Sequence, residues 1–128
     1  MIYLDSSVVL AQLLMEDRKP PNGIWREPLI SSELLRYEVW NRIHARGLGG
    51  SHADEVRALL TRVNLAEMTE RVLARALKAF PVPMRTLDAL HLATAEFLRA
   101  QGEPVRLASY DARLLAGARA LGIELAQL

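Results

Sequence analysis

The chain has 128 residues, of which 51% are hydrophobic and 24% charged, a balance that excludes a disordered protein and suits one folded domain. It has no cysteine, which excludes disulfides, zinc-thiolate sites and thiol nucleophiles. Its 16 Lys and Arg residues nearly balance 15 Asp and Glu residues, leaving a net charge of +1. A nucleic-acid-binding role would therefore depend on a local site rather than on a broad basic surface.

No segment of the chain predicts membrane insertion or export. The longest apolar stretch, Ser6–Met15, has about half the length of a spanning helix. Asp5 precedes it, where a signal peptide would carry positive charge, and Glu16 and Asp17 follow it. These features predict a cytoplasmic protein without a membrane partner.

Short apolar segments alternate with longer helical patterns along the whole chain. Some helix ends carry their own signals: Ser51 is a predicted N-cap, Thr86 another, and Pro81 and Pro83 follow the end of a helix. Strands are predicted at Ile2–Leu4, Leu29–Ser31, Val63–Ala66, Pro104–Ser109 and Ile123–Leu125. Helices are predicted at Ser6–Met15, Ser32–Arg46, Ser51–Thr61, Thr69–Ala79, Thr86–Ala100 and Asp111–Leu121. This alternation predicts an α/β fold with a central, mainly parallel sheet flanked by helices on both faces.

Two aspartates directly follow predicted strands. Asp5 follows Ile2–Leu4, and Asp111 comes shortly after Pro104–Ser109. In parallel sheets ligands bind at the carboxyl ends of the strands, so both carboxylates are candidates for a site. Each aspartate is also in position to be a helix N-cap, and that interpretation stays open.

Two further acids lie within predicted helices that are largely apolar. Glu38 is costly there unless it is paired or bound to a cation, and an ion pair with Arg42 one turn later is the alternative. Asp88 lies in a first turn, where it would also complement the helix dipole. Glu33 is a rival to Glu38, but its own first-turn position is equally typical of such an acid. His91, three residues after Asp88, is more typical of a hydrogen-bonded core residue than of a ligand.

Four carboxylates that converge at one sheet edge would repel one another unless a cation lies between them. Mg²⁺ or Mn²⁺ suits such an all-oxygen, thiol-free site. A bound divalent ion lowers the pKa of a water molecule and offsets charge on a leaving oxygen. The four acids therefore point to metal-dependent hydrolysis of phosphate esters.

Four blocks of the sequence resemble the PIN-domain ribonucleases, in particular the VapC-type toxins of toxin–antitoxin pairs. The blocks occur in the family's order and run from the first predicted strand nearly to the last: Tyr3–Ser7, Ser31–Val39, Leu87–Ala95 and Ser109–Leu114. The resemblance implies one PIN domain over residues 1–128. One region departs from the pattern, because Pro20–Gly23 interrupts a segment that is usually longer and more helical in relatives.

The resemblance also implies roles for particular side chains. Asp5 and Asp88 would be direct ligands of Mg²⁺ or Mn²⁺, and Glu38 and Asp111 would bind the ion directly or through water; all four would be catalytic. Ser7 and Ser109 match hydroxyl residues that orient acids or waters.

The implied activity is endonucleolytic cleavage of RNA, in which water attacks a phosphodiester and leaves a 5′-phosphate. The implied partners are an antitoxin protein that covers the acidic groove and a second copy of the chain. A catalytically silent PIN-like module that binds RNA or protein is an alternative, as is a housekeeping nuclease without an antitoxin. A phosphoacceptor receiver domain fits less well, because Asp5 is followed by serines and the only lysines are Lys19 and Lys78.

Arginine outnumbers lysine 14 to 2, and its forked guanidinium suits phosphate contacts. Several basic and aromatic residues lie near the acidic blocks in sequence. The candidates for RNA contact are Arg36, Arg42, Arg85 and Arg113, with Arg46 also near. Base stacking is open to Trp25, Tyr37, Trp40 and Tyr110, although at least two of these are expected in the core or an interface.

Overall fold

A five-stranded parallel sheet forms the centre of the protein in the computed structural model, which describes residues 1–128. Its strands are Ile2–Leu4 (β1), Leu29–Ser32 (β2), Val63–Ala66 (β3), Arg106–Ala108 (β4) and Glu124–Leu125 (β5). Their order is β3-β2-β1-β4-β5, and each neighbouring pair is parallel. The α/β fold predicted from the sequence is confirmed.

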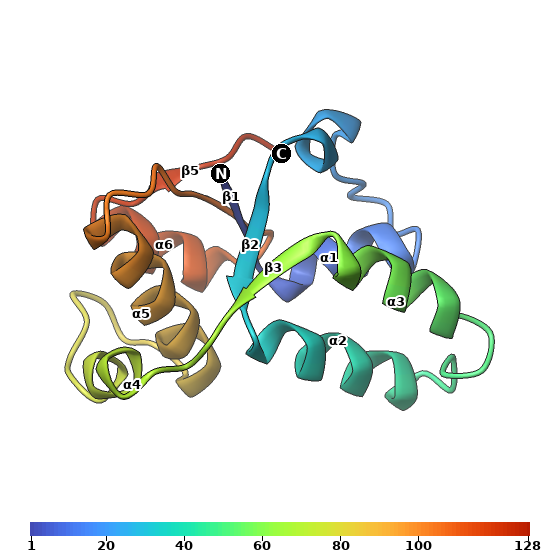
Figure 1. Ribbon diagram of the computed structural model, residues 1–128, viewed down its shortest axis with the longest axis horizontal. Helices are drawn as coiled ribbons and strands as arrows, with labels where there is room; N and C mark the ends of the chain where they lie inside the picture. The colour runs from blue at the N-terminus through green and yellow to red at the C-terminus, as the bar shows by residue number, and fades with distance from the viewer.

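Helices cover both faces of the sheet (Figure 1). On one face lie α1 (Ser6–Leu13), α2 (Leu34–Ala45) and α3 (Ala53–Thr61). The other face carries α5 (Thr86–Ala100) and α6 (Ala112–Ala120). Helix α4 (Glu70–Ala76) packs against α5, and a short 3₁₀ helix, η1, spans Asn22–Arg26. None of these helices combines the length and apolar character required to cross a bilayer.

The alternation of side chains along β1 divides the core into two clusters. Ile2 and Leu4 pack with α1, α2 and α3, whereas Tyr3 between them packs with α5 and α6. The same division separates Leu29 from Ile30 in β2. Because successive residues of a strand point to opposite faces, a strand buried on both faces reads as continuously apolar.

The strand order reverses at β1, and this reversal positions the site. From β1 the chain moves to β2 and β3 on one side of it, and later places β4 and β5 on the other. The connections on the two sides cover opposite faces of the sheet, as right-handed crossovers require (Figure 1). A crevice at the carboxyl ends of the strands is expected at such a switch point.

Several predicted boundaries were wrong by a few residues. Ser32 completes β2 through its pairing with Ala66, so α2 begins two residues later than predicted. His52, not Ser51, occupies the N-cap position of α3, and Thr86 is the first residue of α5 rather than its cap.

Other elements are shorter than predicted. Strand β4 covers only the residues that pair with β1, and β5 has two residues. Helix α1 ends at Leu13, and α4 at Ala76. The Pro20–Gly23 segment overlaps η1, which begins at Asn22 and whose Ile24 is buried in the core.

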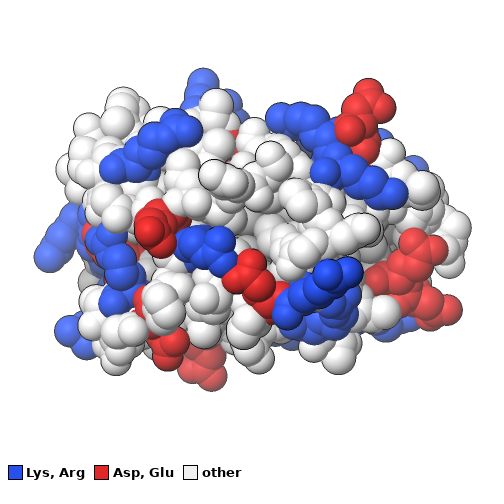
Figure 2. Space-filling model, turned by 90° about the horizontal axis from the view of Figure 1, so that it is seen from above, with Lys and Arg blue, Asp and Glu red and all other residues white.

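Surface charge is mixed on the side where both termini lie. Figure 2 views that side and shows lysine and arginine interspersed with aspartate and glutamate, without a large area of one sign. This agrees with the net charge of +1.

Candidate active site

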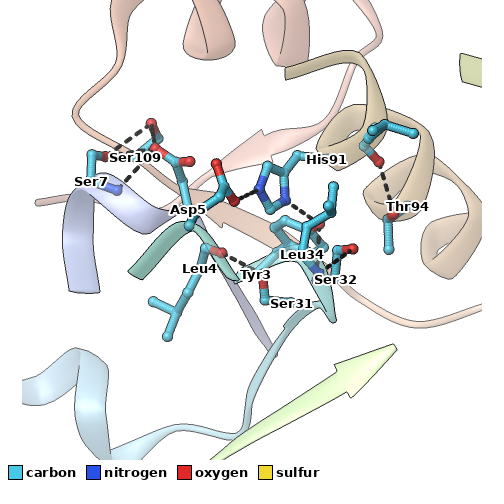
Figure 3. A network of polar contacts seen from close by, with 12 residues as sticks. Tyr3, Leu4, Asp5, Ser7, Ser31, Ser32, Leu34, His91, Thr94 and Ser109 are labelled. Atoms are coloured by element: carbon cyan, nitrogen blue, oxygen red, sulfur yellow. Dashed lines mark hydrogen bonds and ion pairs between the residues drawn. The ribbon is translucent and has the colours of Figure 1, made fainter. Parts of the chain in front are cut away.

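Asp5 lies at the carboxyl end of β1 and is also the N-cap of α1. Its side chain is 5% exposed, and one carboxylate oxygen, Oδ2, accepts three hydrogen bonds. The donors are the Ser7 hydroxyl at 2.7 Å, the Ser109 hydroxyl at 2.8 Å and the Ser7 backbone N–H at 3.4 Å (Figure 3). The other oxygen, Oδ1, has no hydrogen-bond donor in the protein.

The two serines are themselves held by backbone groups from the loop after β4. The Ser7 hydroxyl accepts from the Tyr110 N–H at 2.9 Å, and the Ser109 hydroxyl accepts from the Asp111 N–H at 2.9 Å. Each hydroxyl therefore uses its hydrogen toward Asp5 and a lone pair toward the loop. The network fixes the orientation of the Asp5 carboxylate relative to the ends of both strands.

Asp111 is the N-cap of α6, as the capping alternative proposed. Its Oδ1 accepts from the backbone N–H groups of Arg113 at 2.9 Å and Leu114 at 3.3 Å. Its Oδ2 has no donor in the protein. For Asp5 and Asp111 alike, capping a helix and presenting an oxygen to the strand edge are compatible roles, since a carboxylate has two oxygens.

Glu38, in the second turn of α2, bonds to His91 of α5. The distance between Glu38 Oε1 and His91 Nε2 is 2.5 Å, and the Glu38 side chain is 16% exposed. The expected alternative, an ion pair with Arg42, is absent. Sequence spacing within one helix could not reveal a partner on another helix.

His91 is 1% exposed and joins Glu38 to Tyr3. Its Nδ1 lies 2.8 Å from the Tyr3 hydroxyl, which in turn accepts from the Ser32 N–H at 3.2 Å. Burial lowers the pKa of His91, but the hydrogen bond and charge of Glu38, with Asp5 and Asp88, outweigh it and raise that pKa overall. Burial also raises the pKa of Tyr3 well above its ordinary value, so its hydroxyl stays protonated.

Asp88 lies in the first turn of α5 and makes no hydrogen bond through its side chain. Partial burial raises its pKa, and the negative charges of Asp111 and Asp5 raise it further. His91 and Arg85 act in the opposite direction but do not outweigh these effects. Burial is the larger cause of the shift, and the charges of Asp111 and Asp5 add to it.

All four acids line one cavity of about 410 Å³ at the carboxyl ends of β1 and β4. Two arginines, Arg42 and Arg85, line it as well. The complete lining is Asp5, Ser6, Ser7, Leu10, Glu38, Arg42, Arg85, Thr86, Leu87, Asp88 and Asp111. Four separate segments of the chain thus supply carboxylates to one hollow.

The chemistry of this donor set fits a hard divalent cation. Asp5, Glu38 and Asp111 each have one oxygen bonded within the protein and one without a partner, and Asp88 has both oxygens without one. In this conformation no three acidic or histidine side chains lie close enough together to hold a metal ion. Binding would therefore require side-chain rotation, and Asp88 has no hydrogen bond to oppose it.

The other arginines named as RNA contacts lie outside this cavity. Arg36 and Arg113 are exposed, and the Arg36 guanidinium lies 5.4 Å from the centre of the Tyr37 ring. Arg46 is the exposed C-cap of α2. Arg42 and Arg85 are the two of this group that share the cavity with the acids.

The aromatic candidates divide between core and surface. Trp25, Trp40 and Tyr110 pack against the hydrophobic core, which confirms that at least two of the four serve the core. Tyr37 is 57% exposed on α2. Glu33, the rival to Glu38, precedes α2 and does not line the cavity.

Sequence reasoning missed the polar chain behind Glu38. It identified His91 as a core residue but did not connect it to Glu38, and it assigned no role to Tyr3 or Ser32. A tyrosine in the middle of a buried strand was the available signal, because a buried phenol needs a hydrogen-bond partner.

The model of the PIN domain family matches residues 2–120, which includes all four acids. The chain belongs to the PIN-domain family. The receiver-domain alternative is thereby excluded, and the family suggested by the four sequence blocks is confirmed.

Three ribonucleases of Mycobacterium tuberculosis resemble this PIN domain over nearly its whole length. Ribonuclease VapC46 is 35% identical over 125 residues, which cover 95% of this chain and 93% of that protein. Ribonuclease VapC47 is 31% identical over 129 residues, which cover 95% of this chain and 93% of that protein. Ribonuclease VapC35 is also 31% identical over 129 residues, which cover 96% of this chain and 93% of that protein. The similarity places this chain with the VapC-type PIN domains.

Proposed function

We propose that this PIN domain is an endoribonuclease that requires Mg²⁺ or Mn²⁺ and acts as the toxin of a toxin–antitoxin pair. The observation that carries the proposal is the single cavity into which four chain segments bring Asp5, Glu38, Asp88 and Asp111. The names of the VapC relatives support ribonuclease activity.

Asp5 and Asp88 would hold the ion directly, with Glu38 and Asp111 holding it directly or through water. The unpartnered oxygens of these acids support this assignment, since hard divalent ions prefer carboxylate oxygen. The bound ion would make water more acidic and offset negative charge on the phosphate. Ser7 and Ser109 keep one oxygen of Asp5 fixed, so that the other remains directed to the cavity.

Arg42 and Arg85 would bind the phosphates that flank the scissile bond. They line the cavity beside the acids, and guanidinium groups form paired hydrogen bonds to phosphate oxygens. Arg36 and Arg113, which lie outside the cavity, would contact the RNA at a greater distance from the cleaved bond. Attack of water on the phosphodiester would leave a 5′-phosphate and a free 3′-hydroxyl.

The direct test is cleavage of a labelled single-stranded RNA by the purified protein. We expect cleavage with Mg²⁺ or Mn²⁺, none with EDTA, and products that carry a 5′-phosphate. Asp5→Asn and Asp88→Asn should each lower the rate at least about 100-fold, because each removes a charged metal ligand.

The matched control is Asp54→Asn. Asp54 is fully exposed on α3 and pairs only with Arg57, so its loss should leave the rate and the fold unchanged. Full cleavage by both Asp5→Asn and Asp88→Asn would contradict the assignment. RNA binding without cleavage under any divalent ion would favour the catalytically silent alternative.

We further propose an antitoxin partner whose basic side chain enters the acidic cavity. The excess of carboxylates there supports this, because a neutralising cation would lower their repulsion. We propose the cytoplasm as the compartment in which the chain acts. Its expression should arrest cell growth, and co-expression of a small protein encoded beside it should restore growth. Growth arrest by the Asp5→Asn variant would contradict the toxin assignment. If no protein encoded beside the chain restores growth, a housekeeping nuclease would be favoured.

A homodimer is also proposed, and exposed leucines support it. Leu73 and Leu77 of α4 and Leu87 of α5 are 41%, 89% and 46% exposed. A second copy that covers them would bury apolar surface. Leu77→Glu should convert a dimer into a monomer in light scattering, and a wild-type monomer at high concentration would contradict the proposal.

A further inference from the structure

We propose that His91 is a positioning residue for Glu38: its Nε2–H holds one carboxylate oxygen so that the other is presented to the cavity. The expected effect on kcat rests on the proposed nuclease function. The position of the Glu38 carboxylate can be tested without RNA cleavage. It arises from a polar chain that links Ser32, Tyr3, His91 and Glu38. Figure 3 labels the first three of these residues.

When the His91 imidazole is neutral, one arrangement of hydrogens satisfies all three bonds. The Ser32 N–H donates to the Tyr3 oxygen, and Tyr3 donates its only hydrogen to His91 Nδ1. Nε2 then carries the hydrogen that the Glu38 carboxylate accepts, because an ionised carboxylate cannot donate. The three bonds run in one direction, from the backbone of β2 to the cavity.

The His91 ring cannot turn away from Glu38 at low cost. It is 1% exposed, and its two nitrogens are bonded to groups on opposite sides, from β1 and from α2. Rotation would leave the hydrogen of the buried Tyr3 hydroxyl without its His91 acceptor and an imidazole nitrogen without a partner, which is expensive in the core. The Tyr3 and His91 rings also pack edge to face, with centres 5.7 Å apart.

Without His91, the structure offers Glu38 another partner. Arg42 is one turn further along α2 and lines the same cavity. A Glu38 released by His91 would turn toward Arg42, forming the i, i+4 ion pair that the sequence alone suggests. That pairing would occupy the carboxylate and one of the arginines proposed to bind phosphate.

Two nearly isosteric variants separate the hydrogen bond from the volume of the side chain. His91→Gln can place an amide N–H where Nε2 lies, whereas His91→Met has a similar length and no donor. We expect His91→Met to lower kcat about 10–100-fold, the usual effect of removing a group that orients a metal ligand. His91→Gln should stay within about threefold of the wild type, and neither should change the KM for RNA much.

A double-mutant cycle tests whether His91 acts through Glu38. In a Glu38→Gln background, the additional change His91→Met should cost less than about twofold in kcat. Leu60→Ala serves as a control for general destabilisation, since Leu60 is a core residue of α3 outside the polar chain. It should lower thermal stability while preserving kcat at temperatures where the protein is folded.

Two measurements do not depend on RNA cleavage. A crystal structure of His91→Met should show the Glu38 carboxylate moved toward Arg42, and Mn²⁺ titration without RNA should show weaker binding than in His91→Gln. An unmoved Glu38 with unchanged Mn²⁺ affinity in His91→Met would overturn the inference. Equal losses of kcat in His91→Met and His91→Gln would also overturn it, as would losses from His91→Met and Glu38→Gln that multiply fully in the double variant. A wild-type protein that cleaves no RNA would contradict the proposed function alone, because the structure and the Mn²⁺ titration would still decide the role of His91.

Discussion

The hydroxyl of Ser109 donates a hydrogen bond of 2.8 Å to the carboxylate of Asp5, although 104 positions separate the two residues. The contact exists because β4 pairs directly with β1, with Leu4 opposite Ala108. Both side chains follow immediately after that last pair. The parallel register of the two strands therefore sets the distance between a serine and an acid from opposite ends of the chain.

Ser109→Ala should impair both stability and the proposed activity. It removes a donor to Asp5 and leaves the Asp111 N–H without its acceptor, which should lower the free energy of unfolding by about 1–3 kcal/mol. RNA cleavage should fall about 10–100-fold, because Asp5 would lose an orienting bond. Urea denaturation and a cleavage assay measure the two effects. Ser51→Ala, an exposed control, should change stability by less than about 0.5 kcal/mol, and equal effects at the two positions would contradict the interpretation.

Asp88→Asn should stabilise the protein in EDTA while abolishing cleavage. Partial burial and the nearby charges of Asp111 and Asp5 raise the Asp88 pKa, so stability is lost as the pH rises from its ordinary pKa through the raised one. Replacing this charge by a neutral amide should raise the free energy of unfolding by about 0.2–1 kcal/mol, the range for partly exposed charge pairs.

Mn²⁺ should reverse this order of stability. At ten times its Kd, the ion should stabilise the wild type by about 1.4 kcal/mol and the Asp88→Asn variant by much less. Urea denaturation with Mn²⁺ or EDTA provides the comparison, and Asp54→Asn is the control that should respond to Mn²⁺ like the wild type. Equal stabilisation of Asp88→Asn and wild type by Mn²⁺ would show that Asp88 is not a ligand.

Arg85→Met should weaken RNA binding more than it slows the chemical step. Arg85 lines the cavity beside Asp88, and loss of one phosphate contact should raise the KM about 10-fold and lower the salt dependence of single-strand binding by about 0.7 in log–log slope. Fluorescence anisotropy in an Asp5→Asn background measures binding without cleavage. Arg119→Met, at the exposed end of α6, should leave both quantities unchanged, and a similar loss there would indicate nonspecific attraction instead.

Gly117→Ala should destabilise the protein despite the higher helix propensity of alanine. A Cβ at this position of α6 would lie 2.6 Å from Leu92 Cδ1 and 2.9 Å from Met84 Sδ. Leu92 is fully buried, so overpacking of about 1–3 kcal/mol should exceed a propensity gain of about 1 kcal/mol. Gly50→Ala, where nothing lies within 4 Å, is the matched control for thermal unfolding. A more stable Gly117→Ala variant would mean that α5 and α6 can separate at this contact.

The strands and helices could be predicted because their signals are local. The apolar run Ile2–Leu4 and the spacing of Leu35, Val39 and Ile43 depend only on which faces the core covers. The aspartates after strands were recognisable for the same reason, since an acid following a buried strand is visible in one short segment. The error at Ser32 has a non-local cause, because the end of β2 is set by the pairing of Ser32 with Ala66. The cap predicted at Ser51 was wrong by one position, since His52 is the N-cap of α3.

What only the tertiary structure decided is which polar group bonds to which. Within the sequence, Glu38 has Arg42 as its natural partner, but the packing of α5 against β1 and β2 brings His91 and Tyr3 to it instead. The strand order that places β4 beside β1 likewise determines that Ser109 meets Asp5. Side-chain periodicity follows from one segment at a time, whereas a buried hydrogen bond depends on the relative position of two elements that the chain brings together only on folding.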